Sequence, residues 1–185
     1  VDTRLRPTGS KGPVAVTLNS ALRYYASEAE VWERLAMTRL RAVAGDKAFA
    51  RLFLDGLAAA VYSQPPSGFR EAVAAMRRKM EEEAGEAREG VNIKAGRGGI
   101  VDVEFIAQGL TLEHGGSDPW LRVPNTLTAL RRLRRRGHLP PAAYRDLAQA
   151  YLFLRHAESR LRIVHNISSN DVQNEPVQRH ILAER

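Results

Sequence analysis

Apolar residues recur every three or four positions along most of the chain, which is the spacing of amphipathic α-helices. The clearest stripes run through Phe49, Phe53, Leu57 and Val61, and through Phe69, Val73, Met76 and Met80. Capping residues and glycine or proline stops divide this pattern into separate segments. We therefore predict helices over residues 19–28, 30–39, 46–62, 67–88, 100–113, 125–136 and 142–164, and the start of another near 177.

Only residues 1–18 show the pattern of β-strands. Leu5 lies between Arg4 and Arg6, residues 14–18 form a β-branched apolar run, and the residues between them are rich in proline and glycine. This predicts strand, turn and strand. Because two strands alone are barely stable in water, we expect this hairpin to end a larger α/β unit whose earlier strands lie outside the chain. The predicted fold is mainly α: a short β-hairpin followed by an all-helical bundle.

The charge balance favours anionic partners. The chain has 28 Lys and Arg against 21 Asp and Glu, a formal net charge of +7, which attracts nucleotides, nucleic acids or acidic protein surfaces. It has no cysteine, so disulfides and cysteine-based metal sites are excluded. No apolar run approaches the roughly 18–20 residues of a membrane span, and the first residues resemble no secretory signal. We therefore expect a cytoplasmic protein without membrane contact.

The segment 94–105, Lys-Ala-Gly-Arg-Gly-Gly-Ile-Val-Asp-Val-Glu-Phe, combines glycines, cations and acids at the start of a predicted helix. Glycines beside Lys94 and Arg97 would allow the backbone to approach a phosphate closely. On a helix Asp102 and Glu104 diverge by about 200°, whereas on an extended chain they share a face. Acids in a first helical turn also simply complement the helix dipole, but that leaves the two cations unexplained.

A second candidate site lies at the start of the chain. Asp2 is followed by Arg4, Arg6 and Lys11, and a carboxylate flanked by cations is what magnesium-dependent phosphoryl or nucleotidyl transfer needs. An exposed strand aspartate paired with an arginine would give the same pattern. Lys11 lies in a Gly-Ser-Lys-Gly turn, which lacks the spacing of a Walker A phosphate loop.

Other polar clusters carry weaker signals. Five arginines within residues 131–136 would suit nucleic acid, although such a run more often marks a solvated helix face. The five histidines show no metal-ligand spacing, so we predict no histidine-based metal site.

Four segments resemble, in order, motifs of the glutamine synthetase adenylyltransferases (glutamate–ammonia-ligase adenylyltransferases). Residues 1–9 resemble the motif VDxRLRPxG, and residues 32–39 resemble WERxAxxRAR. Residues 94–105 are similar to KxGxGGIxDIEF, and residues 151–161 to AYxFLRxxExRL. The resemblance covers nearly the whole chain.

The resemblance implies a polymerase-β-like nucleotidyltransferase domain followed by an all-helical domain. Residues 1–45 would be the C-terminal part of the nucleotidyltransferase domain, 46–90 connecting helices, and 91–185 a truncated helical domain like that of PII-uridylyltransferase. Members of the family transfer AMP from ATP to a tyrosine of glutamine synthetase, or remove it by phosphorolysis, under control of the PII signal protein and glutamine. The implied partners are glutamine synthetase and PII, and nucleic acid is not expected.

The resemblance also implies roles for single residues. Asp2 would be a catalytic carboxylate and a ligand of Mg²⁺, and Arg4, Arg6 and Lys11 would bind the phosphates of ATP. The family's second motif would form the junction between the catalytic and helical domains rather than a metal site; its residues here are Lys94, Arg97, Gly98, Gly99, Asp102 and Glu104.

In this superfamily two further carboxylates and a Gly-Ser loop precede the carboxylate that Asp2 matches. We therefore expect the chain to be a fragment of one half of such an enzyme, inactive alone. The adenylylating half is favoured over the deadenylylating half. A helical interaction module that docks on glutamine synthetase or PII without catalysis remains the alternative, and nonspecific RNA binding would rest on charge alone.

Overall fold

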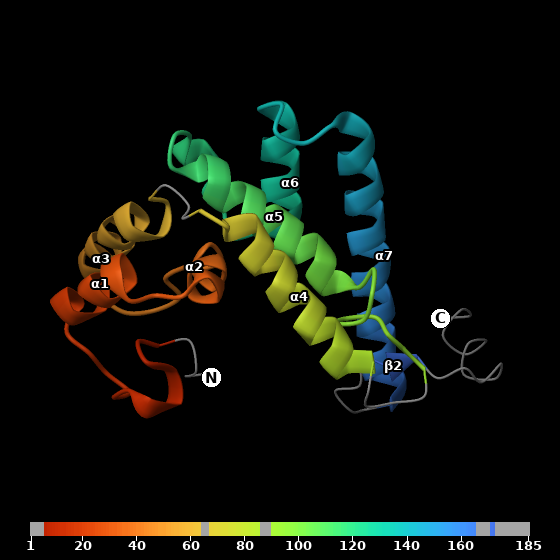
Figure 1. Ribbon diagram of the computed structural model, residues 1–185, viewed down its shortest axis with the longest axis horizontal. Helices are drawn as coiled ribbons and strands as arrows, with labels where there is room; N and C mark the ends of the chain where they lie inside the picture. Colours follow the sequence, from red (N-terminus) through yellow and green to blue (C-terminus); the bar gives the residue numbers. More distant parts are fainter. Residues whose placement is uncertain (1–5, 64–66, 86–89, 166–170, 173–185) are drawn as a thin grey trace.

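A computed structural model of the chain describes residues 6–63, 67–85, 90–165 and 171–172, and seven α-helices dominate them (Figure 1). The helices are α1 (Leu18–Ser27), α2 (Val31–Met37), α3 (Lys47–Val61), α4 (Phe69–Gly85), α5 (Ile100–Gly115), α6 (Thr126–Arg135) and α7 (Pro141–His165). Two short 3₁₀ helices, η1 (Gly9–Lys11) and η2 (Pro119–Leu121), and two strands, β1 (Val91–Asn92) and β2 (Asp171–Val172), complete them. The strands pair antiparallel, with Val91 opposite Val172. A mainly α fold with a small β element is confirmed.

Side-chain caps explain where the predicted helices begin. The Asp46 carboxylate accepts a hydrogen bond from the Phe49 amide at 2.6 Å, and Asn125 Oδ1 accepts from the Thr128 amide at 2.9 Å. Each cap satisfies an amide of the first turn that has no partner within its helix. For α1 the capping residue is Thr17, so the helix begins at Leu18, one residue before the predicted start at 19.

The predicted strand at residues 14–18 is wrong. Residues 14–17 have no strand structure and lead directly into α1 at Leu18. Val14 is 79% exposed, so this β-branched run has no apolar surface to pack against. The two strands that do pair come from residues far apart in the sequence. The first predicted strand, at residues 1–5, and the possible helix near 177 lie outside the described residues.

α5 is the central helix because it is apolar on several sides. One of its faces packs against η2, α6 and α7 in a core of buried residues: Ile100, Val103, Ala107, Leu121, Ala129, Leu130, Leu133, Leu139 and Tyr151. Near its other end, Leu112 joins a second core formed by α1 to α4: Tyr25, Leu35, Met37, Leu57, Val61 and Phe69. The two cores therefore share one helix, and α4 runs beside it (Figure 1).

Tyr62, just after α3, packs on the end of α5. A Cβ atom at Gly115 would lie 2.8 Å from the Tyr62 ring, so only glycine allows this approach. The guanidinium of Arg122 lies over the same ring, 4.7 Å from its centre. Burial raises the pKa of the Tyr62 hydroxyl to about 12. This contact joins the N-terminal helices to the rest of the bundle.

The end of α5 also contacts the loop between α6 and α7. The His114 and His138 rings stack with 3.7 Å between their centres. Burial, and after it the neighbouring His138, lowers the pKa of His114. His114 is therefore neutral near pH 7, and the stack is a contact of an uncharged ring. Among the described residues no helix is long and apolar enough to cross a membrane.

Removing a core leucine tests this packing. Leu133 of α6 is 0% exposed, so Leu133→Ala should lower the free energy of unfolding by about 3 kcal/mol through lost burial and the cavity left behind. Leu152→Ala on α7 is the matched control, because Leu152 is 45% exposed and should cost less than about 1 kcal/mol. Urea unfolding followed by circular dichroism measures both. Equal effects would contradict the core described here.

Candidate functional site

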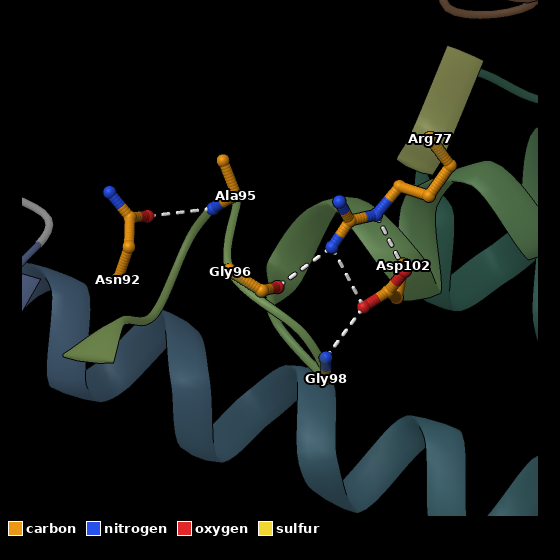
Figure 2. A network of polar contacts seen from close by, with 6 residues as sticks. All are labelled: Arg77, Asn92, Ala95, Gly96, Gly98 and Asp102. Atoms are coloured by element: carbon orange, nitrogen blue, oxygen red, sulfur yellow. Dashed lines mark hydrogen bonds and ion pairs between the residues drawn. The ribbon is translucent and has the colours of Figure 1, made fainter. Parts of the chain in front are cut away.

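The candidate site is the loop between β1 and α5 together with the first turn of α5. Asp102, in that turn, faces α4, where Arg77 projects from the neighbouring helix (Figure 2). The Arg77 Nε donates to Asp102 Oδ1 at 2.6 Å, and its Nη2 donates to Oδ2 at 3.0 Å. The Gly98 amide donates to the same Oδ2 at 2.7 Å. The carboxylate thus accepts three hydrogen bonds from the protein itself.

Arg77 also holds the loop. Its Nη2 donates to the carbonyl of Gly96 at 2.7 Å, and its side chain is only 9% exposed. A guanidinium this deeply buried needs an anionic partner, because an uncompensated charge in the interior is costly. Asp102 supplies that charge. The guanidinium of Arg77 therefore holds both α5, through Asp102, and the loop, through Gly96, against α4.

The loop does not form an open phosphate cradle. The five consecutive amides of residues 98–102 all donate to oxygens of the protein itself. These pairs are Gly98 N to Asp102 Oδ2, Gly99 N to Gly96 O, Ile100 N to Ile93 O, Val101 N to Lys94 O and Asp102 N to Gly99 O, at 2.7–3.1 Å. Anion binding at a helix start requires free amides, and an anion here would have to displace one of these bonds. The phosphate-loop interpretation of this segment is therefore not supported by its geometry.

Two glycines make this loop possible. Gly98 has φ of +73°, a left-handed conformation that other residues rarely adopt. A Cβ atom at Gly99 would lie 2.7 Å from the carbonyl oxygen of Lys94 and 2.8 Å from that of Gly96. The glycines therefore allow the tight turn through which Gly98 reaches Asp102.

Asn92 closes the other end of the loop. Its Oδ1 accepts a hydrogen bond from the Lys94 amide at 3.1 Å and from the Ala95 amide at 2.8 Å, which forms a local turn. Figure 2 shows the bond to Ala95. Its Nδ2 donates to the carboxylate of Asp171 at 2.8 Å. The amide side chain thus links the start of the loop to β2. Sequence reasoning missed both Asn92 and Arg77, since Arg77 is one of several charged residues of α4.

Glu104 points to a different side of α5. Its Oε2 lies 2.9 Å from Arg39 Nη1, in the segment after α2, and its Oε1 accepts a hydrogen bond from the Tyr151 hydroxyl of α7 at 3.1 Å. The Glu104 side chain is 14% exposed. One carboxylate therefore contacts the segment after α2 and the last long helix at the same time.

The two cations of the motif behave differently from its acids. Lys94 and Arg97 are exposed, and within the described part of the chain their side chains have no polar partner. The amides of residues 98–102, in contrast, all have partners.

The N-terminal candidate site is described only in part. Asp2 and Arg4 lie outside the described residues. The Arg6 Nε donates to the Gly12 carbonyl at 3.2 Å, which ties the proline- and glycine-rich turn together, and Lys11 is exposed. In Figure 1 this segment and the loop ahead of α5 lie well apart, with α4 drawn between them.

No group of three or more His, Asp or Glu side chains within the described residues could hold a metal ion. The magnesium ligand that the family motif implies is Asp2, which lies outside the described residues. The roles of Asp2, Arg4, Arg6 and Lys11 at such a site stay predictions.

Comparison with known families divides the chain into two matched parts. The family model described as glutamate-ammonia ligase adenylyltransferase matches residues 1–56, and the one described as GlnD PII-uridylyltransferase matches residues 73–185. Arg39 lies in the first part, and Glu104, Tyr151, Arg77 and Asp102 lie in the second.

Curated relatives agree with these matches. Each of three is named bifunctional glutamine synthetase adenylyltransferase/adenylyl-removing enzyme. The protein of Pseudomonas putida is 38% identical over 89% of the chain, that of Bradyrhizobium diazoefficiens 42% over 89%, and that of Hahella chejuensis 36% over 99%. The chain spans 17%, 17% and 19% of their lengths, about a sixth to a fifth of each relative.

Removing the Asp102 carboxylate tests the ion pair. Asp102→Ala should lower the free energy of unfolding by about 3 kcal/mol, because it leaves the charge of Arg77 buried without a partner. Replacing both residues, Arg77→Met with Asp102→Leu, should recover much of that loss because no buried charge remains. Asp146→Ala, at a 70% exposed side chain on α7, should change stability by less than about 0.5 kcal/mol. If Asp102→Ala unfolds at the same urea concentration as this control, the ion pair does not hold the loop.

The contact of Glu104 with α7 is tested by a double-mutant cycle. Tyr151→Phe should cost about 1.5 kcal/mol, as expected for a lost hydrogen bond to a charged group. After Glu104→Gln the same substitution should cost at least about 0.5 kcal/mol less. Tyr144→Phe on the same helix is the control, because its hydroxyl makes no hydrogen bond within the described residues. Additive effects in the cycle would show that the two side chains do not interact.

Proposed function

The chain belongs to the glutamate-ammonia ligase adenylyltransferase family, and we propose that it forms part of an enzyme that transfers AMP from ATP to a tyrosine of glutamine synthetase, or removes it by phosphorolysis. One observation carries the proposal: relatives 36–42% identical over most of the chain bear the name of that activity. The order of the four motifs along the chain supports it.

The chemistry of the transfer is assigned to the start of the chain. Asp2 would be the catalytic carboxylate and would hold Mg²⁺ beside the bound nucleotide. The cations Arg4, Arg6 and Lys11 would offset the negative charge of the ATP phosphates. Bound Mg²⁺ would supply further positive charge to the same phosphates. The support is the match of residues 1–9 to the family motif.

The glycine-rich motif is assigned to positioning rather than to chemistry. Both carboxylates are occupied: Asp102 by Arg77 and the Gly98 amide, Glu104 by Arg39 and Tyr151. Neither presents an empty pair of oxygens to a metal ion. We assign Glu104 the task of holding the adenylyltransferase-like part, through Arg39, at a fixed place on the helical part.

The setting of the reaction follows from the same family. We propose that the PII signal protein controls the reaction, that the protein is cytoplasmic, and that the chain is part of the adenylylating half of the enzyme. Catalysis on a bound protein substrate distinguishes this proposal from a helical module that docks on glutamine synthetase without catalysis.

The test is a carboxylate-to-amide change at Asp2. In a protein of the relatives' length that carries this sequence, Asp2→Asn should reduce AMP transfer to glutamine synthetase at least about a hundredfold, since the charge at the metal and phosphates is lost while the shape is kept. Incorporation of radiolabelled AMP measures it, and Asp146→Asn on α7 should retain full activity. The 185 residues alone should transfer no AMP. Full activity of Asp2→Asn would remove Asp2 from the active site. Absence of AMP transfer by the unaltered longer protein would refute the proposed function.

A further inference from the structure

A net charge of +5 is concentrated in the segment around α6. Residues 117–149 contain seven arginines, two aspartates and no lysine or glutamate, so this segment alone has a formal charge of +5, against +7 for the whole chain. Charge gathered on one short segment creates a local field much stronger than the net charge would suggest. The segment lies outside the glycine-rich site and outside the residues assigned to nucleotide binding.

The helical period turns this charge to one side. Leu130 and Leu133 of α6 are 0% exposed and pack in the core against α5 and α7. Arg131, Arg134 and Arg135 lie between and beyond them and are exposed. One side of α6 therefore packs its leucines into the core, and the other side presents arginine side chains to the solvent.

Aromatic rings hold the guanidinium groups of three of these arginines in place. The guanidiniums of Arg132 and Arg136 both lie 4.8 Å from the centre of the Trp120 ring, and that of Arg134 lies 5.1 Å from the Tyr144 ring. Such contacts hold a cation in place without neutralising it.

Carboxylates compensate little of this charge. Arg136 pairs with Asp118 at 2.6 Å. Arg131 and Arg135, four residues apart on one face, have no polar partner within the described residues. Within the part of the chain that the structure describes, the surface thus has two cations without a polar partner beside three others that contact aromatic rings. We call these five arginines, with Trp120, the α6 surface.

We infer that the α6 surface docks on a carboxylate-rich patch of glutamine synthetase, the acceptor protein of the proposed reaction; the inference rests on that proposed function. Planar guanidiniums bind carboxylates through two parallel hydrogen bonds. Arginine and tryptophan are also the side chains most often dominant in protein–protein interfaces. Because aromatic rings already orient three of the five guanidiniums, docking costs less side-chain entropy than it would for five free arginines.

The same features disfavour nucleic acid as the partner. Proteins that bind single strands stack bases on free aromatic faces, whereas both Trp120 and Tyr144 already have guanidiniums over their rings. A duplex would be held by phosphate contacts alone, and this possibility is resolved by the test below.

The experiment measures binding of the 185-residue chain to immobilised glutamine synthetase by biolayer interferometry, without nucleotide. The variant Arg131→Glu with Arg135→Glu should raise the Kd at least about tenfold at low salt and flatten the dependence of the Kd on salt between about 50 and 300 mM. The control, Lys47→Glu with Arg51→Glu, makes the same change of charge at two exposed residues four apart on α3 and should alter the Kd less than about threefold.

Each result decides the inference. No binding of the unaltered chain at low salt, or equal losses in both variants, would overturn it, and so would tighter binding to a duplex RNA that depends on the same two arginines. Thermal unfolding by circular dichroism shows whether both variants remain folded, as exposed substitutions should. Because no ATP is present, a failure here leaves Asp2-dependent AMP transfer untouched, and the two failures can be told apart.

Discussion

The ion pair between Arg77 and Asp102 is the contact on which the arrangement around α5 depends. It joins α4 to α5, and through the Gly96 carbonyl and the Gly98 amide it holds the loop that leads into α5. Its strength comes from position: the arginine is buried, so losing its carboxylate partner would leave an uncompensated charge in the interior. A similar pair on the surface would contribute much less.

The two acids of the glycine-rich motif, Asp102 and Glu104, contact different neighbours. Since residues two apart on a helix point in nearly opposite directions, Asp102 reaches α4 while Glu104 reaches the segment after α2 and α7. The motif thus works as a junction between packed elements. Its backbone amides are used in that task, and the proposed nucleotide binding is therefore assigned to the cations near Asp2.

Much of the fold could be predicted because the sequence signals of a helix lie within the helix itself. Apolar spacing and caps such as Asp46 and Asn125 depend on neighbours within four residues. The strand at residues 14–18 was predicted wrongly because β-branched residues favour a strand only when a partner edge and an apolar face are present. The β1–β2 pairing joins residues about 80 apart, and nothing local marks Val91 as a strand.

The candidate site was predictable in outline only. The family motif pointed to residues 94–105 as a junction between domains, and that role stays a prediction. In the structure Asp102 contacts Arg77 of α4, and Glu104 contacts Arg39 and Tyr151. The motif could not single out Arg77, because nothing in α4 distinguishes this arginine from Arg78 until the helix is packed. Nor could it tell which acid faces which neighbour, since that depends on the rotation of α5 in the bundle. The roles of Asp2 and Arg4 rest on the sequence still.

The central claim is that the amides of residues 98–102 serve the fold rather than a ligand. Amide hydrogen exchange followed by nuclear magnetic resonance tests it most directly. We predict that these amides exchange slowly, close to the rate set by global unfolding, and that adding ATP with magnesium changes neither their exchange nor their chemical shifts. Fast exchange that becomes slow when the nucleotide is added would contradict the claim, because it would show that these amides lack a partner in the free protein and bind the phosphate.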